Sequence, residues 1–291
     1  MQVVFHIGAH ATDNGKLLKS LFRNKGVLQK QGVIVTGPSR YRELLQQTVL
    51  RLDGAVPSKE SREVLLDAII DDDHPERIIL SNDNFICFAQ QVFEDQLLYA
   101  ATTERIMALC NLFPDDQVEF HLALCNPATF IPMLHKLTPK LTIEQLLRGT
   151  DPLSLRWSHM VRNIREAAPD AGLTVWCNED TPLIWVQLMH EAAGLEAHVK
   201  LNGAFDLLSE IMSREGMRRF RSYLKSHPPQ TEIQKRRIMS AFLDKFAMEE
   251  AIEEELDVPG WTDELVAQLT DAYEEDIYAI QRMPGVNFIA P

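Results

Sequence analysis

A loop near the N-terminus of the chain combines residue types that bind anionic groups. Residues 10–17 read His-Ala-Thr-Asp-Asn-Gly-Lys-Leu and follow a short apolar run that ends at Gly8. Where such a loop joins a buried strand to a helix, backbone N–H groups at the helix start bind phosphate and a lysine adds a point charge. Gly15 and Lys16 therefore indicate an anion-binding loop.

As a nucleotide-binding loop of the GxxxxGK[ST] type, this segment is incomplete. It keeps Gly15 and Lys16, but His10 replaces the first glycine and Leu17 replaces the hydroxyl residue that holds magnesium. A nucleotide kinase needs that hydroxyl, so the loop disfavours a kinase.

Two clusters of metal-ligand residue types do not predict a metal site. His6 and His10 straddle a strand end and a loop, and only Asp13 could act as a third ligand. We expect a packed His6, a solvated His10 and no metal. The run Asp71-Asp72-Asp73-His74 precedes Pro75, which favours a solvated turn over a cation site.

Two further segments have a functional and a structural interpretation. Glu179 and Asp180 could hold a substrate cation, but their place before Thr181 favours acidic residues that cap a helix. Cys125 could be a nucleophile, but no histidine partner can be assigned to it, so we expect a buried cysteine.

The order of several short motifs resembles the bacterial sulfotransferase family. The segment His6–Leu17 resembles the family's N-terminal HIGxxKTGTTSLQ. Further along the chain, four segments resemble the family's "SSE" and "R-x-P" strand ends, its "yEd" segment and its terminal helix: Leu80–Asp83, Leu124–Pro127, Val175–Asp180 and Tyr273–Asp276. Each motif is short, and their order over nearly the whole chain carries the resemblance.

The resemblance implies a reaction and a set of site residues. In that family a sulfuryl group passes from 3′-phosphoadenylyl sulfate (PAPS) to a hydroxyl or amine, and the loop stabilises the phosphosulfate electrostatically. Asp83 falls at the position of the catalytic base. The residues implied to form the donor-binding loop are Thr12, Asn14, Gly15 and Lys16.

Four departures from the family pattern weaken the implied donor site. The family's loop lysine and glycine fall on Ala11 and Asp13, and its phosphate-binding Arg and Ser fall on Cys125 and Met133. Each lost hydrogen bond to a charged group removes about 1.5–3 kcal/mol. We therefore expect a weak or altered sulfotransferase with an unknown acceptor. The alternative is a non-catalytic binding or interaction protein, a pseudoenzyme that keeps the sulfotransferase-like fold.

These residues must be positioned by strands and helices that alternate along residues 1–206. Strand-like runs lie at 3–7, 77–81, 118–124 and 173–177, with helical patterns between them. One helical pattern ends near Gly32, and another runs from Thr181 to Gly194. This alternation predicts an α/β fold with a mainly parallel central sheet flanked by helices. Ligands then bind at the carboxyl ends of the strands.

Residues 207–291 predict a helical portion packed on the same domain. Residues 214–237 carry eight Lys or Arg and two Glu, and residues 244–276 carry thirteen acidic residues and one Lys. Oppositely charged, solvated helical faces that pair with each other are the simplest explanation. The alternative is a basic helix that reaches over the active-site mouth to hold a phosphate.

The composition limits the partners and the compartment. A formal net charge of −13 opposes binding to nucleic acid or to an anionic membrane surface. Four widely spaced cysteines without a CxxC pair indicate buried thiols in a reducing compartment. The N-terminus has no basic segment before its apolar run, so we expect no signal peptide and a cytoplasmic location.

Overall fold

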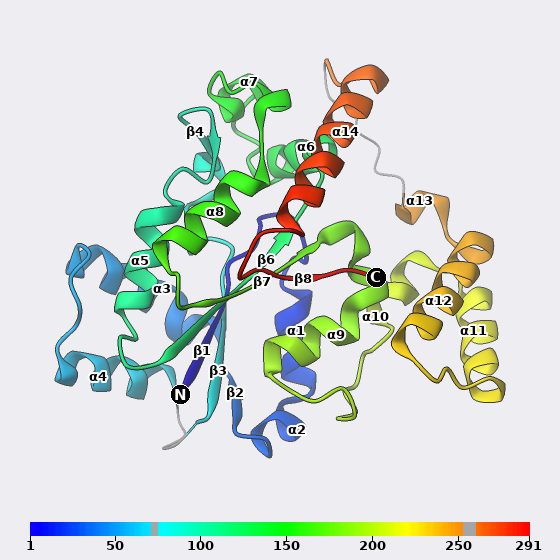
Figure 1. The fold of residues 1–291 in the computed structure, drawn as a ribbon, viewed down its shortest axis with the longest axis horizontal. Coiled ribbons are helices and arrows are strands. Elements are labelled where there is room, and N and C mark those ends of the chain that lie inside the picture. Colours follow the sequence, from blue (N-terminus) through cyan, green and yellow to red (C-terminus); the bar gives the residue numbers. More distant parts are fainter. Residues whose placement is uncertain (71–74, 253–259) are drawn as a thin grey trace.

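The computed structural model describes residues 1–70, 75–252 and 260–291, and the run Asp71–His74 lies outside them. In the described residues, six parallel strands form a sheet in the order β2-β3-β1-β6-β7-β8 (Figure 1). The strands are β1 (Gln2–His6), β2 (Val33–Val35), β3 (Arg77–Ser81), β6 (Gln117–Leu124), β7 (Gly172–Cys177) and β8 (Asn287–Ile289). A separate hairpin pairs β4 (Phe93–Glu94) with β5 (Leu97–Leu98). The predicted mainly parallel α/β fold is confirmed.

Strand β1 is central and lies between β3 and β6. Phe5 pairs in register with Leu80 on one side and Phe120 on the other. Because side chains alternate across a strand, Val3 and Phe5 enter one core and Val4 enters the core on the opposite face. A strand buried on both faces reads as a continuous apolar run, which is why the sequence reveals β1.

Helices cover both faces of the sheet. One face carries α3 (Pro38–Leu52), α4 (Lys59–Ile69), α5 (Thr102–Asn111), α8 (Trp157–Ala167) and α14 (Asp263–Ile280), with α6 (Pro127–Leu137) and α7 (Ile143–Leu147) beside them. The opposite face carries α1 (Lys16–Arg23), α2 (Lys25–Gln29) and α9 (Thr181–Ala193). Helix α9 ends at Gly194, whose φ of 62° is left-handed, as the sequence predicts.

Helices α10 (Asp206–Ile211), α11 (Arg214–Ser226), α12 (Glu232–Phe246) and α13 (Glu249–Ile252) form an extension beside α9 (Figure 1). A small core that includes Met217, Phe220 and Met239 holds α10, α11 and α12 together. A β-bridge between Met212 and Ala247 joins the two ends of the α11–α12 hairpin. The chain then returns through α14 to β8, which pairs with β7.

The described residues do not show the expected pairing of the basic and acidic segments, and Glu253, Glu254, Glu255 and Asp257 of the acidic segment lie outside them. The ion pairs of α11 and α12 are local: Arg219 binds Glu215, and Lys235 binds Glu232. Within residues 1–70, 75–252 and 260–291, no ion pair joins segment 214–237 to segment 244–276. Short-range pairs on one helix form with less loss of chain entropy than pairs between separate elements.

Among the described helices, none combines the length and apolar character needed to cross a membrane.

Candidate functional site

The loops that follow β1, β3, β6 and β7 meet at the carboxyl edge of the sheet. The loop after β1 runs along β6, where Ala9 N–H donates to the Ala123 carbonyl and Ala123 N–H donates to the Gly8 carbonyl. Asn126, after β6, donates its backbone N–H to Glu179, after β7, at 2.7 Å. Strand direction alone therefore brings the four loops together, as a parallel sheet requires.

The N-terminus of α1 is closed by a carboxylate of the same loop. Asp13 Oδ1 accepts the Gly15 N–H at 3.0 Å, and Oδ2 accepts the Leu17 N–H at 2.8 Å. The Asp13 carbonyl accepts the Lys16 N–H at 3.0 Å, and the Asp13 residue is 8% exposed. These are the N–H groups that a helix start offers to a phosphate. Asp13 thus occupies the position of the anion.

The side chains of the residues predicted to form the donor-binding loop do not converge on the start of α1. Lys16 Nζ binds Glu210 of α10 at 2.6 Å, and both side chains are partly exposed. Thr12 Oγ1 donates to the Ala9 carbonyl at 2.8 Å, which folds its hydroxyl back on the loop. Asn14 is exposed with a φ of 51°, and Gly15 has a φ of 73°. The backbone turn of a phosphate loop is present, but its lysine contacts another helix.

His10 is buried, so the expectation of a solvated His10 is wrong. Its backbone N–H donates to Tyr99 Oη, and the ring Nδ1 lies 2.8 Å from the same oxygen. Nε2 lies 3.1 Å from Asn84 Oδ1. The Tyr99 hydroxyl accepts the backbone N–H of His10 and can donate its own proton to Nδ1. The tautomer that fits both ring contacts therefore carries its proton on Nε2 and donates it to Asn84 Oδ1. Burial lowers the pKa of His10, which favours this neutral ring.

His6 is packed, as expected, and its hydrogen-bond partners differ from those of His10. Its Nδ1 contacts Ser81 Oγ at 2.9 Å, and the ring stacks on Trp176 with centroids 5.9 Å apart. The two imidazoles therefore bind different partners instead of converging on one point. In the described residues, no group of three or more His, Cys, Asp or Glu could hold a metal ion.

Asp83 lies directly beside the loop after β1. A Cβ added to Gly8 would lie 3.6 Å from Asp83 Cα, in ordinary van der Waals contact, so the two backbone segments are neighbours. Burial and the charge of Asp13 raise the pKa of Asp83, while His6, His10 and Arg42 oppose the shift. Ahead of Asp83, the Ser81 carbonyl accepts hydrogen bonds from Tyr41 and Arg42. These contacts fix the end of β3 and with it the place of Asp83.

Asp180 is the N-cap residue of α9, as the sequence predicts, but its side chain makes no capping hydrogen bond. Glu179 Oε1 accepts the Asn126 N–H, and Oε2 accepts the Tyr273 hydroxyl at 3.1 Å. No side-chain hydrogen bond caps α9 at Asp180. Burial and the neighbouring charge of Glu179 raise the pKa of Asp180 to about 6, against the influence of Arg236. Protein groups from two other elements hold Glu179, which leaves it no free role as a cation ligand.

The positions of the family's 3′-phosphate ligands are uncharged. Cys125 is buried, its carbonyl accepts the Trp157 indole N–H at 2.8 Å, and its Sγ lies 3.5 Å from Thr129 Oγ1. Met133, on α6, is half-buried. Neither side chain can neutralise a phosphate.

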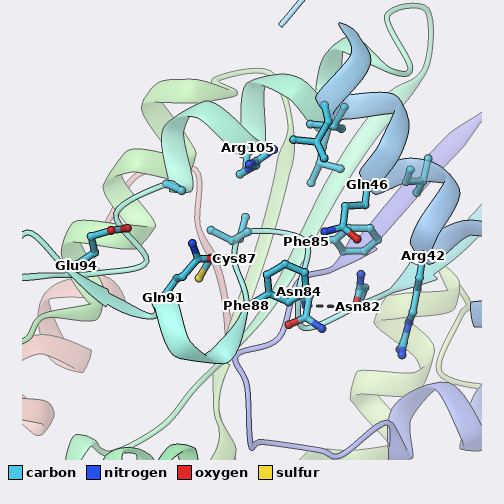
Figure 2. Close-up of a pocket in the computed structure, with 16 residues that line it drawn as sticks. Arg42, Gln46, Asn82, Asn84, Phe85, Cys87, Phe88, Gln91, Glu94 and Arg105 are labelled. Carbon is cyan, nitrogen blue, oxygen red and sulfur yellow. Dashed lines mark hydrogen bonds between the residues drawn. The ribbon is translucent and has the colours of Figure 1, made fainter. Parts of the chain in front are cut away.

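A cavity that the sequence does not predict lies between α3, α5 and the loop after β3 (Figure 2). It has a volume of about 120 Å³ and an apolar floor that includes Leu45, Val49 and Leu109. Asn82 and Asn84, on either side of Asp83, line one end. Its walls come from three elements that are far apart in the sequence, so no local pattern marks it.

The chain matches no protein-family model and no curated protein sequence. Its structure is similar to the crystal structure of a sulfotransferase from Alicyclobacillus acidocaldarius, with a TM-score of 0.40 and 11% identity. The match covers 89% of this chain and 97% of that one. At this identity no residue role can be transferred, so the roles of residues in this chain are inferred from the contacts of its own side chains.

Proposed function

We propose that this chain is a non-catalytic binding protein with a sulfotransferase-like fold whose phosphosulfate site is closed. The observation that carries the proposal is the Asp13 carboxylate bound to the N–H groups of Gly15 and Leu17. The motif order along the chain supports the kinship, and the closed loop supports the loss of transfer chemistry.

A donor phosphate would have to displace Asp13 from the start of α1. Hydrogen bonds to a charged group contribute about 1.5–3 kcal/mol each, so two of them oppose the donor by about 3–6 kcal/mol. This corresponds to roughly 10²–10⁴-fold weaker binding, before repulsion between the two anions is counted. Lys16 offers little compensation, because its ammonium group already pairs with Glu210.

Calorimetric titration with 3′-phosphoadenosine 5′-phosphate, the desulfated donor, tests the proposal. We expect no heat from the wild-type chain at millimolar ligand, and measurable binding by the double variant Ala11→Lys/Asp13→Gly, which restores the family's residues. Asp95→Gly is the matched control, because Asp95 is exposed with a φ of 52° that glycine adopts readily. Micromolar binding by the wild-type chain, about −8 kcal/mol, would overturn the closed-site proposal.

One observation favours a second candidate, an altered transferase with Asp83 as its base. The pKa of Asp83 is raised by burial, and a carboxylate with a raised pKa is a better proton acceptor near neutrality. This candidate predicts labelled sulfate transfer from PAPS to at least one phenol or amine in a panel. It further predicts that Asp83→Asn abolishes the transfer while the fold, followed by circular dichroism, is retained. Turnover of this kind by the wild-type chain would replace the first proposal with the second.

A further inference from the structure

We propose that the cavity between α3, α5 and the loop after β3 binds a small monocarboxylic acid with an apolar body, and that Arg105 binds its carboxylate. The site is separate from the closed loop at Asp13. It can bind such a ligand whether or not that loop admits a nucleotide.

The floor and the rim of the cavity are suited to an apolar body. Besides Leu45, Val49 and Leu109, the buried side chains of Phe85 and Ile86 line the space. The volume of about 120 Å³ is close to the roughly 150 Å³ of an engineered cavity that binds benzene.

Two large apolar side chains at the rim remain in contact with solvent. Leu50 is 61% exposed and Phe88 is 48% exposed, and both line the cavity. A ligand that covers them removes apolar surface from water, which favours binding. The apolar body therefore has contacts both at the floor and at the mouth.

Arg105 supplies a cation that has no hydrogen-bond or ion-pair partner among the described residues. It is half-buried, and in the described part of the chain its guanidinium makes no hydrogen bond or ion pair. Figure 2 shows it at the cavity, above Cys87 and Gln91. The cavity's other arginine, Arg42, already donates to the Ser81 carbonyl. A partly desolvated guanidinium is stabilised by an anion that accepts two parallel hydrogen bonds.

The anionic groups nearby do not satisfy Arg105. Glu94 lines the cavity, but its carboxylate binds Arg148 at 3.0 Å. Burial raises the pKa of the Cys87 thiol to about 12, so at neutral pH this neighbour is uncharged. The guanidinium of Arg105 is therefore open to an anion that a ligand brings.

The charges around the cavity favour a carboxylate over a phosphate dianion. Arg105 is the cation left over, since Arg42 and Arg148 are engaged, and Glu94 adds a negative charge at the rim. The other polar lining groups are neutral amides, among them Gln46, Gln91 and Asn84. One guanidinium and neutral amides match the planar, singly charged head of a carboxylic acid.

Titration with phenylacetate, followed by calorimetry or by NMR shifts, tests the site. We expect saturable binding with a Kd of about 1 mM or tighter, and at least roughly tenfold weaker binding by the neutral isostere phenylacetamide. Arg105→Gln should lower the affinity about tenfold or more, and Arg105→Lys should retain part of it because the charge remains without the fork. Arg162→Gln, an exposed arginine on α8 outside the cavity lining, should bind as the wild type does.

Three outcomes would overturn the assignment. The first is no saturable binding of phenylacetate by the folded wild-type chain, and the second is equal affinity in Arg105→Gln and the wild type. The third is tighter binding of benzylphosphonate, which would identify a dianion site. Neither a positive nor a negative result depends on the titration with 3′-phosphoadenosine 5′-phosphate, so the two proposals fail independently.

Discussion

Leu17 donates its backbone N–H to Asp13 Oδ2 at 2.8 Å, which places a negative charge against the first turn of α1. The positive end of a helix dipole and its unpaired N–H groups both favour an anion at this point. A loop that binds a phosphosulfate needs free N–H groups at the start of its helix. In this chain the Asp13 carboxylate occupies those N–H groups. Under the proposed function, the contact that stabilises the start of α1 is also the one that opposes donor binding.

Replacement of Asp13 should lower the stability of the protein. We expect Asp13→Ala to reduce the free energy of unfolding by about 1–3 kcal/mol, because both capping hydrogen bonds are lost. Asp13→Asn should lose less, since its amide oxygen still accepts one N–H. Urea unfolding measures the change, with Asp67→Asn on the exposed face of α4 as control. Equal stability of Asp13→Ala and the wild type would contradict the capping role.

Replacement of Gly8 should be more damaging than replacement of an exposed helical glycine. Gly8 has a φ of 104°, and an added Cβ would lie 3.1 Å from the His10 nitrogen. We expect Gly8→Ala to cost about 1–3 kcal/mol through backbone strain. Gly26 lies in α2 with open space around it, so Gly26→Ala should be neutral or stabilise by up to about 1 kcal/mol. Thermal unfolding of the two variants compares them, and a harmless Gly8→Ala would contradict the backbone strain expected at this position.

Asp180 should make the stability depend on pH between about 4 and 6. Its pKa is near 3.8 when unfolded and about 6 when folded, so the native state binds more protons in this window. The contribution of Asp180 to the free energy of unfolding should therefore fall as the pH rises from 4 to 6 and stay level above 6. After a discount for partial exposure, Asp180 contributes about 1–2 kcal/mol to this fall.

The variant Asp180→Asn isolates that contribution. Relative to the wild type, it should gain stability as the pH rises through the window, which denaturant titrations at several pH values measure. Asp170→Asn, in an exposed turn, serves as control. A stability difference between Asp180→Asn and the wild type that does not change with pH would rule out the raised pKa.

The thiol of Cys87 should react slowly despite its place in a cavity. Burial raises its pKa to about 12 and that of Cys110 to about 11, so very little of either thiol is thiolate at neutral pH. We expect iodoacetamide to label both much more slowly than a free cysteine, as followed by peptide mass spectrometry. Because Arg105 lowers the pKa of Cys87, Arg105→Gln should slow Cys87 further and leave Cys110 unchanged. Labelling of Cys87 at the rate of a free thiol would contradict this account.

The sequence predicts the elements whose two ends carry local signals. The bounds of β3 and α9 are examples, since an apolar run between polar loops and a glycine at position 194 mark them. It misses β2 because this strand has only three residues, Val33–Val35, which are too few to show a period. Strand β8 is missed because it forms only by pairing with β7, with Asn287 opposite Thr174 more than a hundred residues earlier.

The candidate site is predicted in its residue types but not in its contacts. The sequence identifies Asp13 as a carboxylate in an anion loop, but only the fold shows that it turns onto Gly15 and Leu17. The burial of His10 depends on Tyr99, and the direction of Lys16 depends on Glu210. Such long-range partners leave no trace in the local pattern.

The bridge between Met212 and Ala247 also bears on how this chain can change over evolutionary time. Ser213 donates its N–H to the Phe246 carbonyl, and Met248 donates to the Ile211 carbonyl, so the α11–α12 hairpin begins and ends at one point. An exchange of this hairpin need not displace any strand of the sheet, but it must keep the small core shared with α10 and the packing of α12 on α9. The α11–α12 hairpin is therefore attached by one bridge and one packed face, and substitutions on its exposed face leave both the sheet and the loop at Asp13 untouched.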